Sequence, residues 1–207
     1  MATATSRDPG ADFAVLVPGG TEPPEEIPPE IFDAALAIYR ERRRLDMRAL
    51  AADLGIGRAT LYRKVGNRDR LLGEVMWYLT RVAMACSLVK AEDRRGAERV
   101  VEVLRLFMSA VNGSADLRHF LEAEPEAALR VLTSKHGPVQ PGVTEALESL
   151  LTQEEERGNL RLTIDRGTLA YVIVRIGEGF LYADVIADQE PDVDAAVEVV
   201  ARLLREP

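Results

Sequence analysis

DMRALAADLGIGRATLYRKV, residues 46–65, is the stretch of sequence that decides the fold. Its first half predicts a short amphipathic helix, because Asp46 is a good N-cap and four apolar residues follow at i, i+3, i+4 and i+7: Met47, Leu50, Ala51 and Leu54. Gly55 comes directly after them, where glycine most easily adopts the left-handed conformation that ends a helix. Ile56 and Leu61 can anchor a second helix from about Gly57 to Val65. The stretch therefore predicts a helix-turn-helix.

The second of these helices has the side chains expected of a helix that enters the DNA major groove. Hydroxyl and cationic groups bond base edges and phosphates, and small residues allow close approach. We expect base or groove contacts from one set, with Ala59 as the small residue: Arg58, Thr60, Tyr62 and Arg63. We expect phosphate contacts from a second set: Arg43, Arg44, Arg48, Lys64 and Arg68. The alternative is an ordinary amphipathic helical hairpin with a solvated surface.

The distribution of charge favours a DNA-binding end. The chain has 207 residues and a net charge of −8, which taken as a whole argues against nucleic acid. Residues 30–72 nevertheless carry ten Lys or Arg against six acids, so they have a net charge of +4 and the remainder has −12. A basic segment on an acidic chain is what a protein needs if only one end touches DNA.

Residues 51–72, AADLGIGRATLYRKVGNRDRLL, carry a family resemblance. They resemble the DNA-binding signature of the TetR family of bacterial transcriptional regulators, with matches at Thr60, Leu61, Tyr62, Asn67, Leu71 and Leu72. Three positions depart from the family pattern: Gly57, Lys64 and Val65. The resemblance implies an all-α, TetR-like protein with a three-helix DNA-binding head and a helical ligand-binding and dimerisation domain. It also implies a homodimeric, cytoplasmic repressor that binds a double-stranded DNA operator and is released by a small molecule.

Helical patterns continue through the rest of the chain, and no alternating strand pattern competes with them. We expect a flexible Pro/Gly-rich leader at 1–29 with an apolar patch, Phe13–Val17, that docks on the body, a DNA-binding domain at 30–75, and a ligand-binding and dimerisation domain at 76–207. The expected helices outside the motif cover residues 30–44, 67 to about 92, 97–112, 125–132, 141–157, 165–187 and 192–204.

The expected helix 165–187 holds most of the information about a ligand site. It is apolar nearly all round, but Tyr171, Arg175, Glu178 and Tyr182 form one polar line. These groups could orient a ligand in an apolar cavity, or Arg175 and Glu178 could simply pair with each other. The full set of residues that we expect to line the ligand site is Trp77, Phe107, Met108, Phe120, Tyr171, Arg175, Glu178 and Tyr182.

Two further stretches refine the resemblance. TSKHGPVQPGV (133–143) and AYVIVRIGEGFLYADVI (170–186) resemble the QsdR-like subgroup of TetR regulators, which implies an amphipathic effector such as a lactone or acyl compound. The last two expected helices are similar to the pair through which TetR regulators dimerise. Two heads one helical turn apart read a two-fold operator, which is the physical reason for a dimer.

Catalytic and metal-binding patterns are missing from the sequence. His119 and His136 lack neighbouring metal ligands, no serine lies in a nucleophile elbow, and Cys86 is the single cysteine. The sequence therefore predicts neither an enzyme nor a cofactor, and one cysteine fits a reducing cytoplasm. Its longest apolar run, 169–174, is far too short to span a membrane. Two other classes stay open: a ligand-independent regulator, and a helical small-molecule carrier with a vestigial DNA-binding head.

Overall fold

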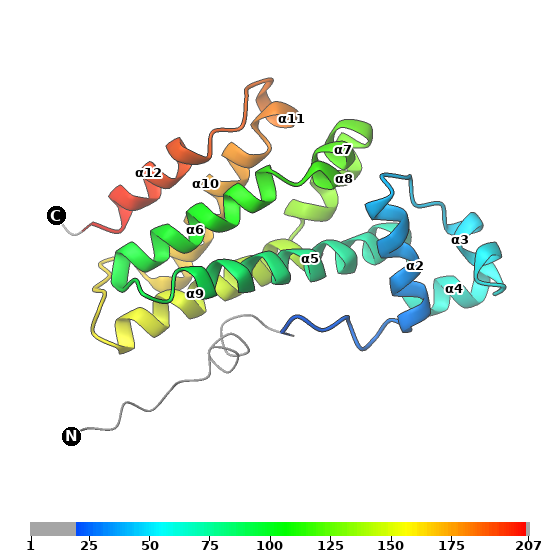
Figure 1. The fold of residues 1–207 in the computed structure, drawn as a ribbon, viewed down its shortest axis with the longest axis horizontal. Coiled ribbons are helices and arrows are strands. Elements are labelled where there is room, and N and C mark those ends of the chain that lie inside the picture. The colour runs from blue at the N-terminus through cyan, green and yellow to red at the C-terminus, as the bar shows by residue number, and fades with distance from the viewer. Residues whose placement is uncertain (1–19, 206–207) are drawn as a thin grey trace.

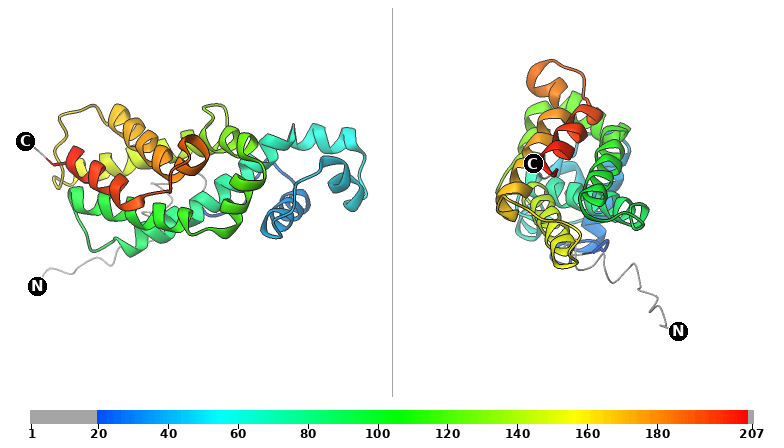
Figure 2. Two further views of the ribbon diagram at one scale, coloured as in Figure 1. Left: turned by 90° about the horizontal axis from the view of Figure 1, so that it is seen from above. Right: turned by 90° about the vertical axis from the view of Figure 1, so that its left-hand side faces the viewer.

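The structure is a computed structural model that describes residues 20–205, and this part is all-α, as predicted (Figure 1). The helices are α2 (Pro29–Arg40), α3 (Met47–Asp53), α4 (Arg58–Val65), α5 (Arg68–Lys90), α6 (Gly96–Asn112), α7 (Ala115–Ala123), α8 (Pro125–Thr133), α9 (Val139–Glu156), α10 (Arg166–Leu181), α11 (Ala183–Ala187) and α12 (Val193–Leu203). Helices α2, α3 and α4 gather at one end of an elongated molecule, and the others form its body (Figures 1 and 2).

The helix-turn-helix forms as the sequence predicts. The Asp46 side chain accepts hydrogen bonds from the backbone amides of Arg48 and Ala49, so it caps α3. Gly55 has a φ of 65°, a left-handed conformation that costs glycine little and turns the chain toward α4. Leu50 and Leu61 are fully buried and hold the two helices together. The apolar faces of both helices therefore point inward, which leaves the polar face of α4 outside.

Helix α5 joins the two ends of the molecule (Figure 1). Asn67 caps it by accepting a hydrogen bond from the amide of Arg70, directly after α4 ends. Helix α5 then packs against α2 and α4 at one end and against α6, α8 and α9 further along. Among the described residues, α5 is the one helix long and apolar enough to cross a membrane by length and composition, but core helices pass the same test and half of its most apolar window is buried.

Helices α6, α9, α10 and α12 complete the body with α5. Helix α10 packs against α9 and α12, and α12 packs in turn on α6 (Figure 2). Their inward faces are aliphatic and include Val100, Leu150, Leu151 and Ile173, all at most 1% exposed. Apolar burial of this kind is the main stabilising contribution to a helical body.

Two helix predictions were wrong in their limits, and one helix was not predicted. Helix α2 was expected to reach Arg44 but ends at Arg40, because Arg42 adopts a left-handed φ of 56°. The expected helix 165–187 is interrupted at Tyr182, which divides it into α10 and α11. Helix α7 was not predicted, although Ser114 caps it by accepting a hydrogen bond from the amide of Leu117.

Residues 20–28, part of the segment expected to be a flexible leader, contact the body. Ile27 is 2% exposed, and Arg81 donates a hydrogen bond to the carbonyl oxygen of Glu22 at 2.6 Å. Arg70 also pairs with Glu26 at 2.9 Å. These contacts place the segment along α5. The expected apolar patch at Phe13–Val17 lies outside the described residues.

Candidate DNA interface and ligand cavity

Helix α4 presents an open polar surface at the end of the molecule. Tyr62 is 47% exposed although it is a large aromatic residue, while Leu61 and Val65 on the opposite face are fully buried. The other predicted groove residues share this surface: Arg58, Ala59 and Arg63 are exposed, and Thr60 is half-buried. Lys64, a predicted phosphate contact, is exposed beside them. The sequence-predicted groove set therefore lies together on one helix face.

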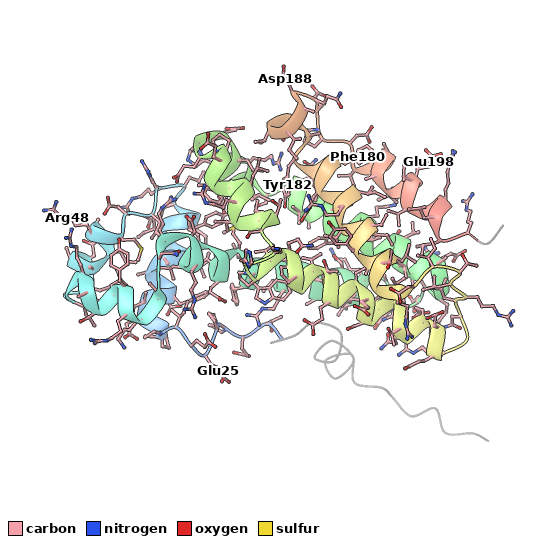
Figure 3. The ribbon with its side chains drawn as sticks, turned by 180° about the vertical axis from the view of Figure 1, so that it is seen from behind. Glu25, Arg48, Phe180, Tyr182, Asp188 and Glu198 are labelled. Carbon is pink, nitrogen blue, oxygen red and sulfur yellow. The ribbon has the colours of Figure 1, made fainter. Side chains whose placement is uncertain are left out.

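The arginines expected to contact phosphate separate into two groups. Arg48 lies at the outer end of the head and points away from the body (Figure 3), and Arg43 and Arg44 are also exposed. Arg68 is different, because it is only 20% exposed at its side chain and binds Glu124 at 2.5 Å and the carbonyl oxygen of Leu45 at 2.8 Å. Arg68 thus holds the α2–α3 loop against the body, a use that sequence spacing could not show.

Ion pairs connect this head to α7 and α8. Arg42 donates a hydrogen bond to Asp116 at 3.0 Å, and Arg44 lies 3.3 Å from Glu124. Arg130 on α8 donates to Asp69 at the start of α5 at 2.7 Å. The seam between head and body therefore contains three partly exposed ion pairs beside the aromatic contact of Tyr39 with Phe120. The ion pairs cost little to rearrange compared with a close-packed apolar interface.

A cavity of about 250 Å³ lies in the body between α5, α6, α9, α10 and α12. Most of its lining is aliphatic, and the side chains come from helices far apart in the sequence. Its apolar lining includes Met76, Leu79, Leu104, Phe107, Met108, Val143, Ile173 and Val197. A predominantly apolar cavity with a few polar groups is the usual form of a small-molecule site.

The polar groups in the cavity lining include Glu178, Tyr182 and Tyr39. Burial raises the pKa of Glu178 to about 7, against the opposing effect of Arg175, whose Nη1 lies 2.5 Å from Oε2. Burial also raises the pKa values of both tyrosines, with Asp116 acting on Tyr39 and Glu178 acting on Tyr182. Figure 3 shows Tyr182 directed among the body helices. The tyrosines therefore stay protonated and able to donate hydrogen bonds.

Four of the eight residues expected to line a ligand site lie in the lining of this cavity: Phe107, Met108, Glu178 and Tyr182. The other four residues do not line it. Trp77 packs on Gly142, Phe120 packs edge-on against the other side of Tyr39, and Tyr171 and Arg175 lie largely at the surface. The polar line of α10 was correct as a helix face, but sequence could not show that the cavity begins only at Ile173. Tyr39 was missed because it belongs to the head.

A second, smaller cleft of about 170 Å³ lies at the seam between head and body. Tyr39 and Asp116 line both this cleft and the main cavity. Asp116 also accepts the hydrogen bond from Arg42 in the α2–α3 loop. One tyrosine and one carboxylate thus separate the cavity from the loop that precedes the helix-turn-helix.

Comparison with known proteins identifies the family. Residues 95–205 match the family model described as "Tetracyclin repressor-like, C-terminal domain". The chain belongs to the TetR family of transcriptional regulators. The TetR-family repressor QsdR of R. erythropolis is similar in structure, with 30% identity and a TM-score of 0.78 over 86% of this chain and 95% of that one. FadR of Bacillus subtilis, solved in complex with stearoyl-CoA, has 18% identity and a TM-score of 0.53 over 84% and 96%, which shows a common fold alone. No match was found among curated protein sequences.

Membership of the TetR family confirms three predictions. The fold is TetR-like, the chain is a transcriptional regulator, and it is not an enzyme, because this is a family of regulators. The described residues also contain no group of three or more His, Cys, Asp or Glu that could hold a metal ion. The candidate functional surfaces are therefore the face of α4 and the cavity.

Proposed function

We propose that this TetR regulator is a homodimeric, cytoplasmic repressor that binds a two-fold DNA operator and is released by a small amphipathic effector. One observation carries the proposal: only two residues separate the end of α4 from the start of α5, and α5 then lines the cavity with Met76, Leu79, Thr80 and Ala83. A ligand that moves α5 must also move the helix-turn-helix. We assign residues 30–75 to the DNA-binding head and 76–207 to the ligand-binding and dimerisation body.

In this proposal one set of residues contacts base edges or the groove, with Ala59 allowing close approach: Arg58, Thr60, Tyr62 and Arg63. A second set contacts phosphates: Arg43, Arg44, Arg48 and Lys64. Arg68 orients the α2–α3 loop, since Glu124 and the carbonyl of Leu45 already occupy its guanidinium. Phosphate contacts supply affinity at any sequence, while groove contacts supply the sequence preference. Substitutions in the phosphate set should therefore lower the affinity for any DNA sequence, whereas substitutions in the groove set should lower the preference for the operator.

Release follows if the effector binds better to the form in which the two heads no longer match the operator. A ligand shifts such an equilibrium only by its difference in affinity for the two forms. The contact that transmits the shift lies beside the cavity, where Tyr39 and Asp116 separate it from Arg42. The QsdR-like stretches favour a lactone or acyl compound as effector.

The direct test is operator binding. Fragments bound by the full chain are selected from genomic DNA, and affinity for the selected fragment is measured by fluorescence anisotropy. Tyr62→Ala should weaken binding by roughly 5-fold to 150-fold, from a loss of about 1–3 kcal/mol, and its thermal unfolding should stay close to wild type because Tyr62 is exposed. Arg94→Ala, which removes an exposed charge from the body, is the matched control and should leave affinity unchanged.

Two outcomes would favour the other classes. A chain that selects no fragment but binds small molecules in its cavity would be a carrier. A chain that binds its operator with the same affinity whatever compound is added, and shows no thermal shift with any, would be a ligand-independent regulator. Binding that is insensitive to Tyr62→Ala would remove α4 from the interface and overturn the proposed mode of DNA recognition.

A further inference from the structure

Glu178 is the buried charged group in the wall of the main cavity. The residue is 9% exposed, and its Oε2 atom is buried without a hydrogen-bond partner. Arg175 forms an ion pair with the same oxygen at 2.5 Å, but its side chain lies half in solvent, so the carboxyl group has no donor from the buried side of the cavity wall. Buried polar groups are normally hydrogen-bonded. A bound ligand could therefore supply the hydrogen-bond donor that this carboxyl group lacks on its cavity side.

The cations near the cavity are paired or lie at its edge: Arg118, which acts on Tyr182, pairs with Asp184 and donates a hydrogen bond to the carbonyl oxygen of Leu181. Asp116 is acidic, and Arg42 already pairs with it. Arg40 is exposed and lies at the rim, on the last turn of α2. The hydroxyls of Tyr39 and Tyr182 take part in no hydrogen bond within residues 20–205. The interior therefore combines one buried carboxyl group with two unbonded hydroxyls.

We propose that the effector presents an N–H donor, as an amine or amide, to the carboxyl group of Glu178, and that it carries no anionic group. This inference rests on the proposed function, because it concerns the same cavity. The apolar part of the effector then lies along Leu104, Met108 and Ile173. The Tyr182 hydroxyl, which lies near Glu178, can bond a second polar atom of the same head group.

Charge explains why an anionic ligand is excluded. A carboxylate placed beside Glu178 would bring two like charges together in a dry site, and one of the two groups would have to take up a proton. An N–H donor instead gives the Glu178 carboxyl group a hydrogen bond from the cavity side. If the donor is an ammonium group, it also adds an opposite charge. Fatty acids and phosphate-bearing acyl compounds should therefore bind poorly at this point of the wall.

Isothermal titration calorimetry with three eight-carbon probes tests the inference on the full chain. The probes are octylamine, octanamide and octanoate, and the pH is about 8, where Glu178 is mostly ionised. We expect octylamine and octanamide to bind at least tenfold more tightly than octanoate. Glu178→Gln should lower the affinity for octylamine at least tenfold and narrow its advantage over octanoate. Glu198→Gln, which changes an exposed glutamate on α12, is the matched control and should have no effect.

A variant that fills the cavity distinguishes failure of the inference about Glu178 from failure of the proposed function. Gly177→Leu adds a side chain toward Met108, whose sulfur would lie 3.8 Å from a new Cβ, so it should abolish binding of all three probes. If octanoate binds wild type as tightly as octylamine, or if Glu178→Gln leaves octylamine binding unchanged, the inference is overturned while the effector cavity stands. If no probe binds, or if binding survives Gly177→Leu, the cavity itself is not the effector site and the proposed function fails with it.

Discussion

At the scale of single residues, Gly142 is a position where the packing leaves no room for a side chain. A Cβ atom there would lie 2.4–2.8 Å from three atoms of the Trp77 ring, closer than real contacts allow. Gly142→Ala should therefore lower the free energy of unfolding by about 1–3 kcal/mol, the usual cost of overpacking. Urea denaturation measures this. Gly167→Ala, whose Cβ would meet nothing closer than 3.5 Å, is the control and should leave stability nearly unchanged.

Glu178 should make stability depend on pH. Burial raises its pKa from 4.5 to about 7, so the folded chain holds this proton more tightly than the unfolded chain does. For this group the free energy of unfolding falls as the pH rises from about 4.5 to about 7, by on the order of 3 kcal/mol. Wild type and Glu178→Gln, compared by urea denaturation across that range, should diverge with pH. A constant difference between the two would contradict the assignment.

At the scale of elements, a buried ion pair ties α6 to α9. Glu154 is 0% exposed and accepts hydrogen bonds from the Gly96 amide, Arg99 and Asn159 at 2.7–3.0 Å. Burial alone would raise the pKa of Glu154, but these bonds bring it below its ordinary value. Glu154→Leu leaves the guanidinium group of Arg99 buried without its ion-pair partner.

Such a loss usually costs about 3–5 kcal/mol. We expect the midpoint of thermal unfolding to fall by roughly 2–4 °C for each kcal/mol lost in a chain of this size. The control is Arg105→Ala on α6, which breaks only partly exposed contacts with Asp194 and Glu102 and should cost less than about 1 kcal/mol. If the two variants lowered the midpoint of thermal unfolding equally, burial of the Arg99–Glu154 pair would not explain its contribution to stability.

Elements whose signals are local were predictable from sequence. Asp46 was expected to cap a helix, and three other expected helices began at Asn67, Asp165 and Asp192. Each of these four side chains accepts a backbone hydrogen bond at the start of a helix. Features that depend on distant partners were not predictable. The pairing of Arg99 with Glu154 joins positions 55 residues apart, and Tyr39 reaches the cavity only through the packing of α2 against α5. The exposed surface of α4 was therefore predictable from local sequence, whereas only four of the eight residues expected to line a ligand site lie in the cavity lining.

At the scale of the whole molecule, α10 and α12 leave apolar side chains open to solvent on the body. Tyr171 and Val172 on α10 and Val199 and Leu203 on α12 are 37–52% exposed. Helices α10 and α12 also pack against each other, so these side chains belong to one pair of neighbouring helices. An exposed apolar surface of this kind is typical of an interface, and a second copy of the chain would cover it through two-fold symmetry.

The double substitution Val199→Glu with Leu203→Glu should therefore convert the proposed dimer into a monomer. Each head would stay folded, because α12 makes no contact with α2, α3 or α4 among the strong contacts of the described chain. Operator affinity should nevertheless fall strongly, since one head alone holds only one half-site. Sedimentation velocity gives the oligomeric state, and anisotropy on the selected fragment gives the affinity. Val89→Glu, which charges an equally exposed apolar residue on α5, is the control and should leave both unchanged. A double variant that remains dimeric would place the interface elsewhere, and a monomer with undiminished operator affinity would show that one head suffices.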